Sequence, residues 1–552
     1  MREYRTHWMQ LIVAGLVVAA VWMCLPGCRK RPSEDVAEIP EMKVTVSKAT
    51  TYFTGPLNKN GTVNYVAAYN NLNGKGVTRD NNAAVLLLRA IGPEGMRNGK
   101  NYPKADAIEK RTLELLEMNE WSEKGNYFVD VNDYVSKVFP DDPDSDEAVA
   151  FEERFFKSYD KLTGSLVPAG SRDHPEYAKW LEMNRGPLAL VTAASKRSRY
   201  FVPAVSRSDP PRLFDSVLGE LDPTIRCRKL TMALVSRAML KAGDGDIVGA
   251  LADLLTVHRL ARLLGEDLVM VHLLSAIGVD KSAYDGDLAL IAGGKLSGSQ
   301  AREYLKQLRQ LKALPEFADV INVDERVHKI ECLIMSGRIG LPIFEEDGKT
   351  QMPVNVDWDL LLTTYNQLLD ECVKALRQPT LVEARTGLEK IRKQITDEGL
   401  IDVEAVKLNM NNPDETKAAV EHSLRHFQKT VDRFGVENVG KLSRAFAQEE
   451  AYPKQHIERA LELWYRIRAR ADLTRISLAM IAYKADKAQY PETLAALRPK
   501  YLKAAPKDRF TGKPLKYTRK GDGYVLYSVG KNLKDDSGDD EDRNDIVIRI
   551  DR

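Results

Sequence analysis

Residues 490–550, near the end of the chain, read YPETLAALRPKYLKAAPKDRFTGKPLKYTRKGDGYVLYSVGKNLKDDSGDDEDRNDIVIRI. Three short runs within them, Pro514–Tyr517, Gly523–Val529 and Asp545–Ile550, are rich in Val, Ile, Leu and Tyr. Residues that favour turns, among them Gly, Asp and Pro, bound these runs, so the pattern favours β-strands separated by turns. The stretch therefore predicts a small antiparallel β-sheet.

An acidic loop, Lys531–Asp545, connects the second and third of these runs. It carries seven acidic and three basic side chains, so its net charge is −4. Like charges held close together repel and raise one another's pKa, a penalty that a divalent cation removes. Calcium accepts about 6–8 oxygen ligands in a flexible geometry, which suits an irregular loop of Asp and Asn. The alternative is a solvated acidic loop without an ion, and the spacing of an EF-hand is absent from the sequence.

The same stretch resembles the C-terminal domain of the major pseudopilin of bacterial type II secretion. The resemblance rests on Tyr490-Pro491 at the end of a long predicted helix and on the turn Pro506–Tyr517, PKDRFTGKPLKY. It continues with Ser528–Asn532, SVGKN, and with the closing pair Asp545-Ile546. This resemblance covers about the last seventh of the chain and implies a pilin-like fold for it.

The pseudopilin family holds calcium in this loop, so the resemblance implies a structural calcium ion. The sequence departs from the family pattern at three places: Arg509 replaces a Pro, Thr511 is an additional residue, and Asn532 replaces the usual Asp. The expected ligands are side chains of the acidic loop, first Asp535, Asp536 and Asp545, and after them Asn532, Asp540 and Asp542.

Before this stretch, apolar residues recur mainly at three- and four-residue intervals, which predicts that most of the chain is helical. The clearest pair of predicted helices, Arg226–Lys241 and Ile247–Leu264, resembles one tetratricopeptide hairpin, but no 34-residue period surrounds it. Further helices are predicted over 81–91, 106–120, 266–276, 299–313, 357–377, 381–395, 414–434, 436–448 and 453–488. The range 51–77 is predicted to be irregular or to hold short strands, and the range 337–357 is predicted to be a long loop or lid.

The expected fold class is α+β: a mainly α-helical bundle or irregular helical-hairpin (TPR-like) body with a small C-terminal pilin-like antiparallel β-domain. Four segments follow from this: a signal peptide or anchor over 1–28, a tether and irregular segment over 29–80, a helical body over 81–450, and a long helix with the β-domain over 453–552. As a whole the chain resembles a class of bacterial envelope lipoproteins.

The N-terminal residues predict export. Two arginines precede an apolar run of fifteen residues, Leu11–Leu25, which has the length of a signal-peptide core. The tetrapeptide Leu25–Cys28 resembles a lipobox, which predicts cleavage and lipidation at Cys28. The alternative is an uncleaved transmembrane anchor over 8–27. Both place the remaining chain on the periplasmic side of the cytoplasmic membrane.

The overall charge is nearly balanced, with 81 basic and 79 acidic side chains and a net charge of +2. This balance gives no electrostatic reason to expect a nucleic-acid partner. Beyond the signal, Cys227, Cys332 and Cys372 lack CxxC spacing, so we expect free thiols and no disulfide framework or zinc site.

The sequence contains no Gly-x-Ser-x-Gly elbow, P-loop or dinucleotide-binding glycine pattern. His422 and His426 lie four residues apart on a predicted helix but have no third metal ligand at a known spacing. His258 and His272 lie in apolar helices and are interpreted as core or boundary residues, whereas His328 is interpreted as part of a charged helical face.

These patterns predict an exported, membrane-tethered, non-enzymatic scaffold or interaction protein with a structural calcium site and an unidentified protein partner. One alternative is a secreted hydrolase whose site lies in the helical body under the loop 337–357. Another is an accessory protein of a secretion system. A cleft with two carboxylates or a Ser/His pair would favour the hydrolase.

Overall fold

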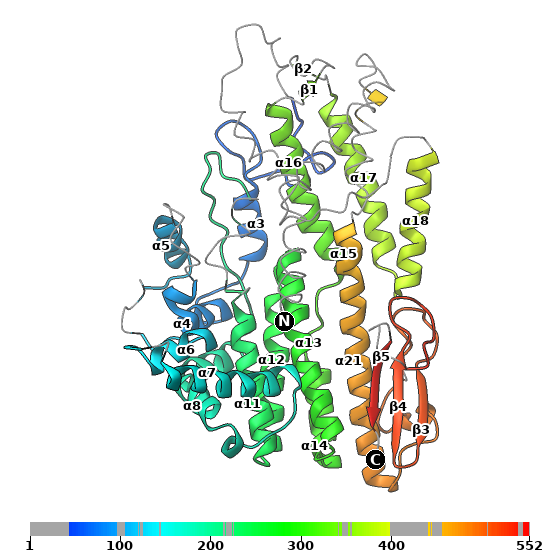
Figure 1. Ribbon diagram of the computed structural model, residues 1–552. Coiled ribbons are helices and arrows are strands. Elements are labelled where there is room, and N and C mark those ends of the chain that lie inside the picture. Colours follow the sequence, from blue (N-terminus) through cyan, green and yellow to red (C-terminus); the bar gives the residue numbers. More distant parts are fainter. Residues whose placement is uncertain are drawn as a thin grey trace.

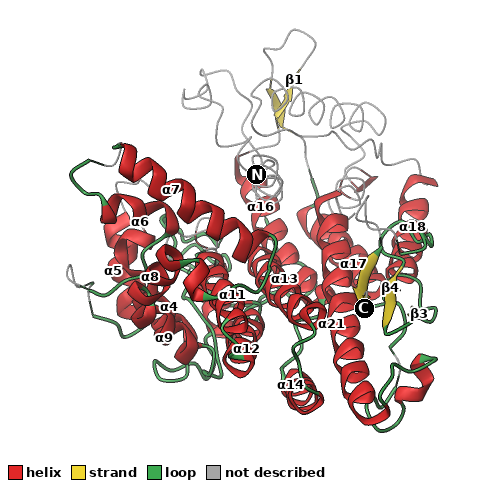
Figure 2. Ribbon diagram, turned by 60° about the horizontal axis from the view of Figure 1, so that its bottom comes forward, coloured by secondary structure: helices red, strands yellow, loops and turns green. Residues whose placement is uncertain are grey.

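The computed structural model shows a helical protein with a small sheet at one edge (Figures 1 and 2). It describes residues 43–96, 105–119, 121, 125–142, 145–213, 216, 223–224, 226–339, 342–344, 351–353, 356–397, 440–441, 443, 455–504, 506–538 and 545–550. Within these residues the α+β class is confirmed, since the structure is mainly helical and has a three-stranded antiparallel sheet near its C-terminus.

The described helices form three successive groups. The first group is α3 (Tyr65–Asn73), α4 (Ala83–Met96), α5 (Ala105–Leu115), α6 (Val131–Val138), α7 (Asp146–Tyr159), α8 (Pro175–Met183) and α9 (Arg185–Ala194). The central group is α11 (Cys227–Gly243), α12 (Ile247–Leu264), α13 (Met270–Gly293) and α14 (Gly298–Gln310). The last group is α15 (Phe317–Val320), α16 (Arg326–Ile339), α17 (Trp358–Leu376), α18 (Leu381–Asp397) and α21 (Gln455–Lys487).

The predicted central hairpin is present as α11 and α12. Its turn is closed by Asp246, whose side chain accepts a hydrogen bond from the Gly249 amide at 2.8 Å and so caps α12. Gly243 at the end of α11 lies against the backbone of Ala169, where a Cβ atom would stand 2.1 Å from the carbonyl carbon. Helix α13 packs against both α11 and α12, and this trio forms the centre of the body.

The C-terminal sheet has the order β3-β4-β5, in which β3 (Lys516–Lys520) and β5 (Ile546–Ile550) flank β4 (Gly523–Ser528). All neighbours are antiparallel, as the sequence predicts. Helix α21 packs against β4 and β5 and also against α13 and α14, so it lies between the sheet and the body (Figure 1). The apolar side chains of the sheet therefore belong to the same core as those of the helices.

The predicted turn before β3 is organised by one buried carboxylate, Asp508. Its Oδ1 atom accepts hydrogen bonds from the amides of Phe510 at 2.7 Å and Thr511 at 3.0 Å. Its Oδ2 atom accepts one from the amide of Val529 at 3.0 Å, directly after β4. One side chain thus joins the turn to the end of the central strand, which explains why this position holds Asp.

Residues 43–53, at the end of the predicted tether, pack against α16 and α17. The Asn366 side chain donates to the carbonyls of Ala49 at 2.8 Å and Thr50 at 2.9 Å. The guanidinium of Arg326 lies 5.0 Å from the ring centre of Tyr52. Residues 43–53 therefore join the body at this helix pair.

Several sequence-based boundaries are wrong. Helix α3 lies inside the range 51–77, predicted to be irregular, and is capped by Asn64. Helix α13 begins at Met270, after Leu268 with its left-handed φ of 57°, and continues to Gly293 rather than ending at residue 276. The predicted loop 337–357 contains the end of α16 and a hairpin of β1 (Pro342–Phe344) and β2 (Gln351–Pro353).

Other boundaries agree closely with the prediction. The backbone of α4 breaks at Gly92, with φ 75° and ψ 177°, where the sequence predicts the end of a helix, although one further turn follows. The predicted helix 414–434 lies outside the described residues, as does most of 436–448.

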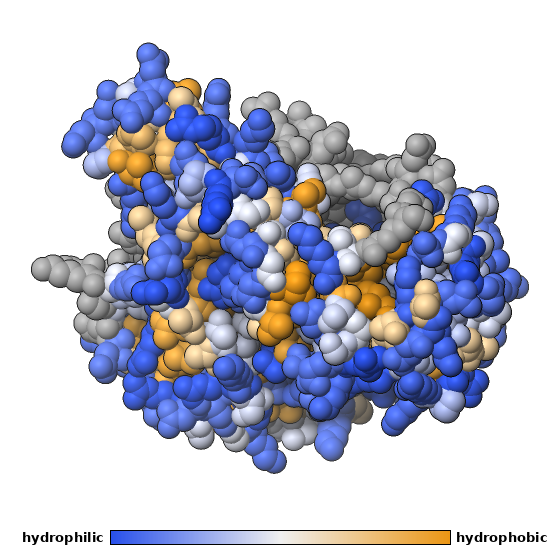
Figure 3. Space-filling model, turned by 90° about the horizontal axis from the view of Figure 1, so that it is seen from below, coloured by the Kyte–Doolittle hydropathy of each residue, from blue (hydrophilic) through white to orange (hydrophobic). Residues whose placement is uncertain are grey.

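The surface seen from below is mostly hydrophilic, and hydrophobic side chains gather in the hollows of its middle part (Figure 3). Among the described residues, no helix is both long and apolar enough to cross a membrane. The apolar run Leu11–Leu25 lies outside them, so the predicted export signal stays a prediction.

Candidate cation site

The acidic loop leaves β4 and returns to β5, so its two described ends are held side by side by the strand pair. Asp535 at the first end is already neutralised. Its carboxylate accepts a hydrogen bond from the Tyr527 hydroxyl at 2.8 Å and pairs with Lys516 Nζ at 2.8 Å. Lys516 and then Tyr527 hold the pKa of Asp535 below its ordinary value. The negative charge of Asp535 is therefore balanced without a metal ion.

Asp536 and Asn532 contact each other. The Asn532 amide nitrogen donates to Asp536 Oδ2 at 2.7 Å, and Asn532 Oδ1 accepts from the Lys534 amide at 3.1 Å. The pair stiffens the first half of the loop. Among the described residues no hydrogen bond reaches the other carboxylate oxygen of Asp536.

Asp545 differs from the two other described acids of the loop, Asp535 and Asp536, because its side chain is buried, with only 3% of the residue exposed. Its Oδ2 atom accepts a hydrogen bond from the Gly538 amide at 3.0 Å. Its Oδ1 atom is buried and has no hydrogen-bond partner among the described residues. Burial raises the pKa of Asp545, and the charges of Asp536 and Asp535 raise it further, whereas the Gly538 amide and, to a smaller extent, the Asp536 amide lower it.

A buried carboxylate oxygen without a partner costs about 1–3 kcal/mol or more, since its hydration is lost without replacement. The described structure therefore places Asn532, Asp535, Asp536 and Asp545 at one end of the sheet without arranging them around a common centre, and Asp545 is the one with a buried oxygen that lacks a partner among the described residues. Asp540 and Asp542 lie outside the described residues. Within those residues no group of three or more His, Cys, Asp or Glu side chains is arranged to hold a metal, so the calcium ion stays a prediction.

The sequence-based reasoning missed a second cluster, in the helical body. The imidazole of His258 on α12 lies between two carboxylates of α13, with Nδ1 2.6 Å from Asp280 Oδ1 and Nε2 3.0 Å from Asp287 Oδ2. Arg262 Nη1 lies 2.7 Å from Asp280 Oδ2, and the Tyr304 hydroxyl donates to Asp287 Oδ1 at 2.7 Å.

This His258 cluster is closed to solvent: His258 is 0% exposed, and Asp280 and Asp287 are each 1% exposed. The interpretation of His258 as a core histidine is confirmed. The signal that could have revealed its partners is the pair of aspartates spaced seven residues apart, and therefore on one face, in an apolar helix. A burial this complete gives a substrate no access to the imidazole.

The other histidines have simpler surroundings. His272 is buried, as predicted, with Nδ1 2.6 Å from Asp267 Oδ2. His328 Nδ1 lies 2.8 Å from Asp324 Oδ1, and its side chain is 21% exposed, so the predicted charged face is partly buried. His422 and His426 lie outside the described residues. Cys227 and Cys372 are buried and Cys332 is half-buried, and none of the three forms a disulfide within the described part of the chain.

Comparisons with protein-family models, with curated proteins and with solved structures find no match for this chain.

Proposed function

We propose that the protein is an exported, membrane-tethered, non-enzymatic scaffold whose C-terminal sheet is stabilised by a calcium ion bound at Asp545. The observation that carries the calcium site is the buried Oδ1 atom of Asp545, which lacks a partner beside two further loop carboxylates. A hard cation satisfies that oxygen and reduces the repulsion that raises the pKa of Asp545. Asp536 supplies the second carboxylate, because Asp535 is paired with Lys516.

The scaffold role is supported by the burial of a cluster of ionisable side chains in the helical body. The His258 cluster, which has residue types suited to acid–base chemistry, is enclosed by helices, and both ring nitrogens of His258 face carboxylates of the same cluster. In this proposal α11 and α12 form a tetratricopeptide-like hairpin and the sheet is pilin-like. The Gly-Asp turn of the hairpin and the antiparallel sheet with its acidic β4–β5 loop support these two assignments.

The tether is the N-terminal part of the chain, lipidated at Cys28 or spanning the membrane as an uncleaved helix. The packing of residues 43–53 against α16 and α17 supports a firm attachment between tether and body.

Thermal unfolding with calcium and with EGTA tests the proposed ion. Calcium should raise the melting temperature, because an ion that binds only the folded loop stabilises it by about 2.7 kcal/mol at a hundredfold excess over its Kd. In Asp545→Asn the difference between calcium and EGTA should disappear. With EGTA alone this variant should be as stable as the wild type or more stable, because an amide costs less to bury than a carboxylate.

The matched control is Asp522→Asn, an exposed residue of the β3–β4 turn, which should keep the full calcium response. Equal melting of the wild type with calcium and with EGTA would contradict the calcium site. That result would not bear on the scaffold role, which is tested by identifying the protein partner.

A further inference from the structure

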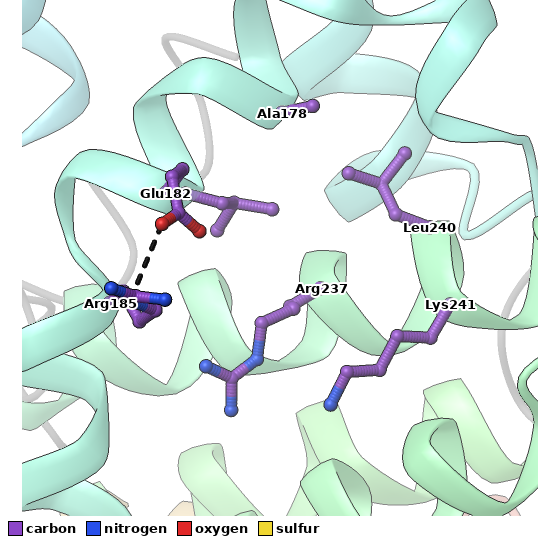
Figure 4. A pocket seen from close by; sticks show the side chains of 7 residues that line it. Ala178, Glu182, Arg185, Arg237, Leu240 and Lys241 are labelled. Atoms are coloured by element: carbon purple, nitrogen blue, oxygen red, sulfur yellow. Dashed lines mark ion pairs between the residues drawn. The ribbon is translucent and has the colours of Figure 1, made fainter.

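A surface pocket of about 330 Å³ lies between α8, the start of α9 and the second half of α11 (Figure 4). Its apolar wall is formed by Ala178 and Leu181 from α8 and by Leu240 from α11. This wall has room for a short hydrocarbon group. It lies in the helical body, on elements that do not carry the proposed calcium site.

Two cations enter the pocket from α11, one turn apart. Arg237 holds Asp253 of α12 with two hydrogen bonds, from Nε at 2.8 Å and from Nη2 at 2.6 Å. Lys241 Nζ lies 2.8 Å from the same carboxylate. The Asp253 side chain is 6% exposed, whereas those of Arg237 and Lys241 are 22% and 32% exposed. One carboxylate therefore serves two half-buried cations, and one positive charge is left over at the pocket.

A third cation faces them from the opposite rim. Arg185, the first residue of α9, pairs with Glu182 at 3.3 Å, and the two side chains are 78% and 68% exposed (Figure 4). Surface pairs of this kind contribute only about 0–1 kcal/mol, so a ligand can replace Glu182 at low cost. The arginine fork is suited to the two oxygens of a carboxylate or phosphate.

We propose that this pocket binds a small organic anion. Its carboxylate or phosphate group lies between Lys241 and Arg185, and its apolar part contacts Leu181 and Leu240. Arg237 keeps Asp253 neutralised, so that Lys241 is able to turn towards the ligand. Glu182 competes with the ligand for Arg185.

Isothermal titration with acetate, butyrate and inorganic phosphate tests this pocket. Butyrate should bind several-fold more tightly than acetate if the ligand is a carboxylate on an apolar chain, because the extra methylene groups leave water. Binding of phosphate in preference to both identifies a phosphate ester as the ligand class. The proposal is overturned if none of the three binds.

Two variants locate the binding. Lys241→Met should weaken it about tenfold, since one charge-assisted hydrogen bond is lost, while Arg237 still neutralises Asp253 and preserves the fold. Glu182→Gln should strengthen binding several-fold by releasing Arg185. Arg111→Gln is the control, because Arg111 also pairs with an exposed glutamate three residues away, Glu114, outside the pocket. Unchanged affinity in Lys241→Met, or no gain in Glu182→Gln, would refute the site.

Discussion

His258 shows how a single residue organises the middle of the body. Burial lowers its pKa, but Asp287 and Asp280 on either side of the ring raise it by more, so its pKa lies above the ordinary value. A protonated imidazole and Arg262 match the two aspartates in charge, and burial raises the pKa of Asp287 against the opposing effect of His258. The Tyr284 ring, whose centre lies 4.4 Å from that of the imidazole, completes the enclosure. Buried charges of this kind are tolerated only when they are paired and hydrogen-bonded.

Replacing His258 with Gln should therefore destabilise the protein by about 3–5 kcal/mol, because both aspartates lose the cation between them. Urea unfolding followed by circular dichroism measures the change. Lys281→Gln is the control, since it removes a partly exposed pair with Asp285 and should cost no more than about 1 kcal/mol. A loss of the same small size in both variants would contradict the ionic description of the cluster.

His328 predicts how stability depends on pH. Burial lowers its pKa, but Asp324, with help from Glu331 and Glu325, raises it to about 9, whereas the unfolded chain has a value near 6.5. Because the folded value is the higher one, the stabilisation is complete below about pH 6.5 and is lost as the pH rises through 9.

The free energy of unfolding should thus fall between about pH 6.5 and pH 9, and it should fall less steeply in His328→Gln. Urea unfolding at a series of pH values gives both slopes. Parallel curves for the two proteins would show that His328 does not contribute.

At the scale of elements, the α11–α12 hairpin depends on the absence of a side chain at Gly243. A Cβ atom there would meet the backbone of Ala169, which cannot move aside as a flexible side chain can. Gly243→Ala should therefore destabilise the protein by about 1–3 kcal/mol through overpacking.

Gly293→Ala provides the comparison for Gly243, because a Cβ atom at Gly293, the last residue of α13, meets nothing within 4 Å. There the gain in helix propensity should leave stability unchanged or raise it by about 0.5–1 kcal/mol. Thermal melts of the two variants should move in different directions. A stable Gly243→Ala variant would mean that the hairpin and the segment before α8 can separate.

At the scale of the whole molecule, α21 joins two parts that the sequence suggests are separate. Its apolar residues on one side contact α13 and α14, and on another side they contact β4 and β5 (Figure 1). The turn before β3 also contacts the start of α18. There the amide of Leu381 donates to the carbonyl of Arg509, and the amide of Val382 donates to the carbonyl of Phe510, both at 3.1 Å. The sheet is therefore built into the body, and loss of its core residues would be felt by the helices.

Local patterns predicted much of this architecture. Helix α12 has the predicted limits, Ile247–Leu264, and the strands β4 and β5 differ from the predicted runs by one residue. Such elements are specified by residues close to one another in sequence: apolar spacing, a capping Asp246, and turn residues between strands. The errors at α3 and at the start of α13 arose where capping and left-handed backbone decide the boundary, because apolar spacing does not report these features.

The sequence by itself determined that the chain is mainly helical, that it ends in a small antiparallel sheet, and that an acidic loop joins two of its strands. Only the tertiary structure decided which partner each charged side chain has and how deeply it is buried. The register that pairs Lys516 with Tyr527 brings both to Asp535, and the packing of α12 on α13 encloses His258 between two aspartates. The physical reason is that periodicity records which face of an element is buried, whereas the partner of a buried charge comes from another part of the chain and depends on how the elements pack.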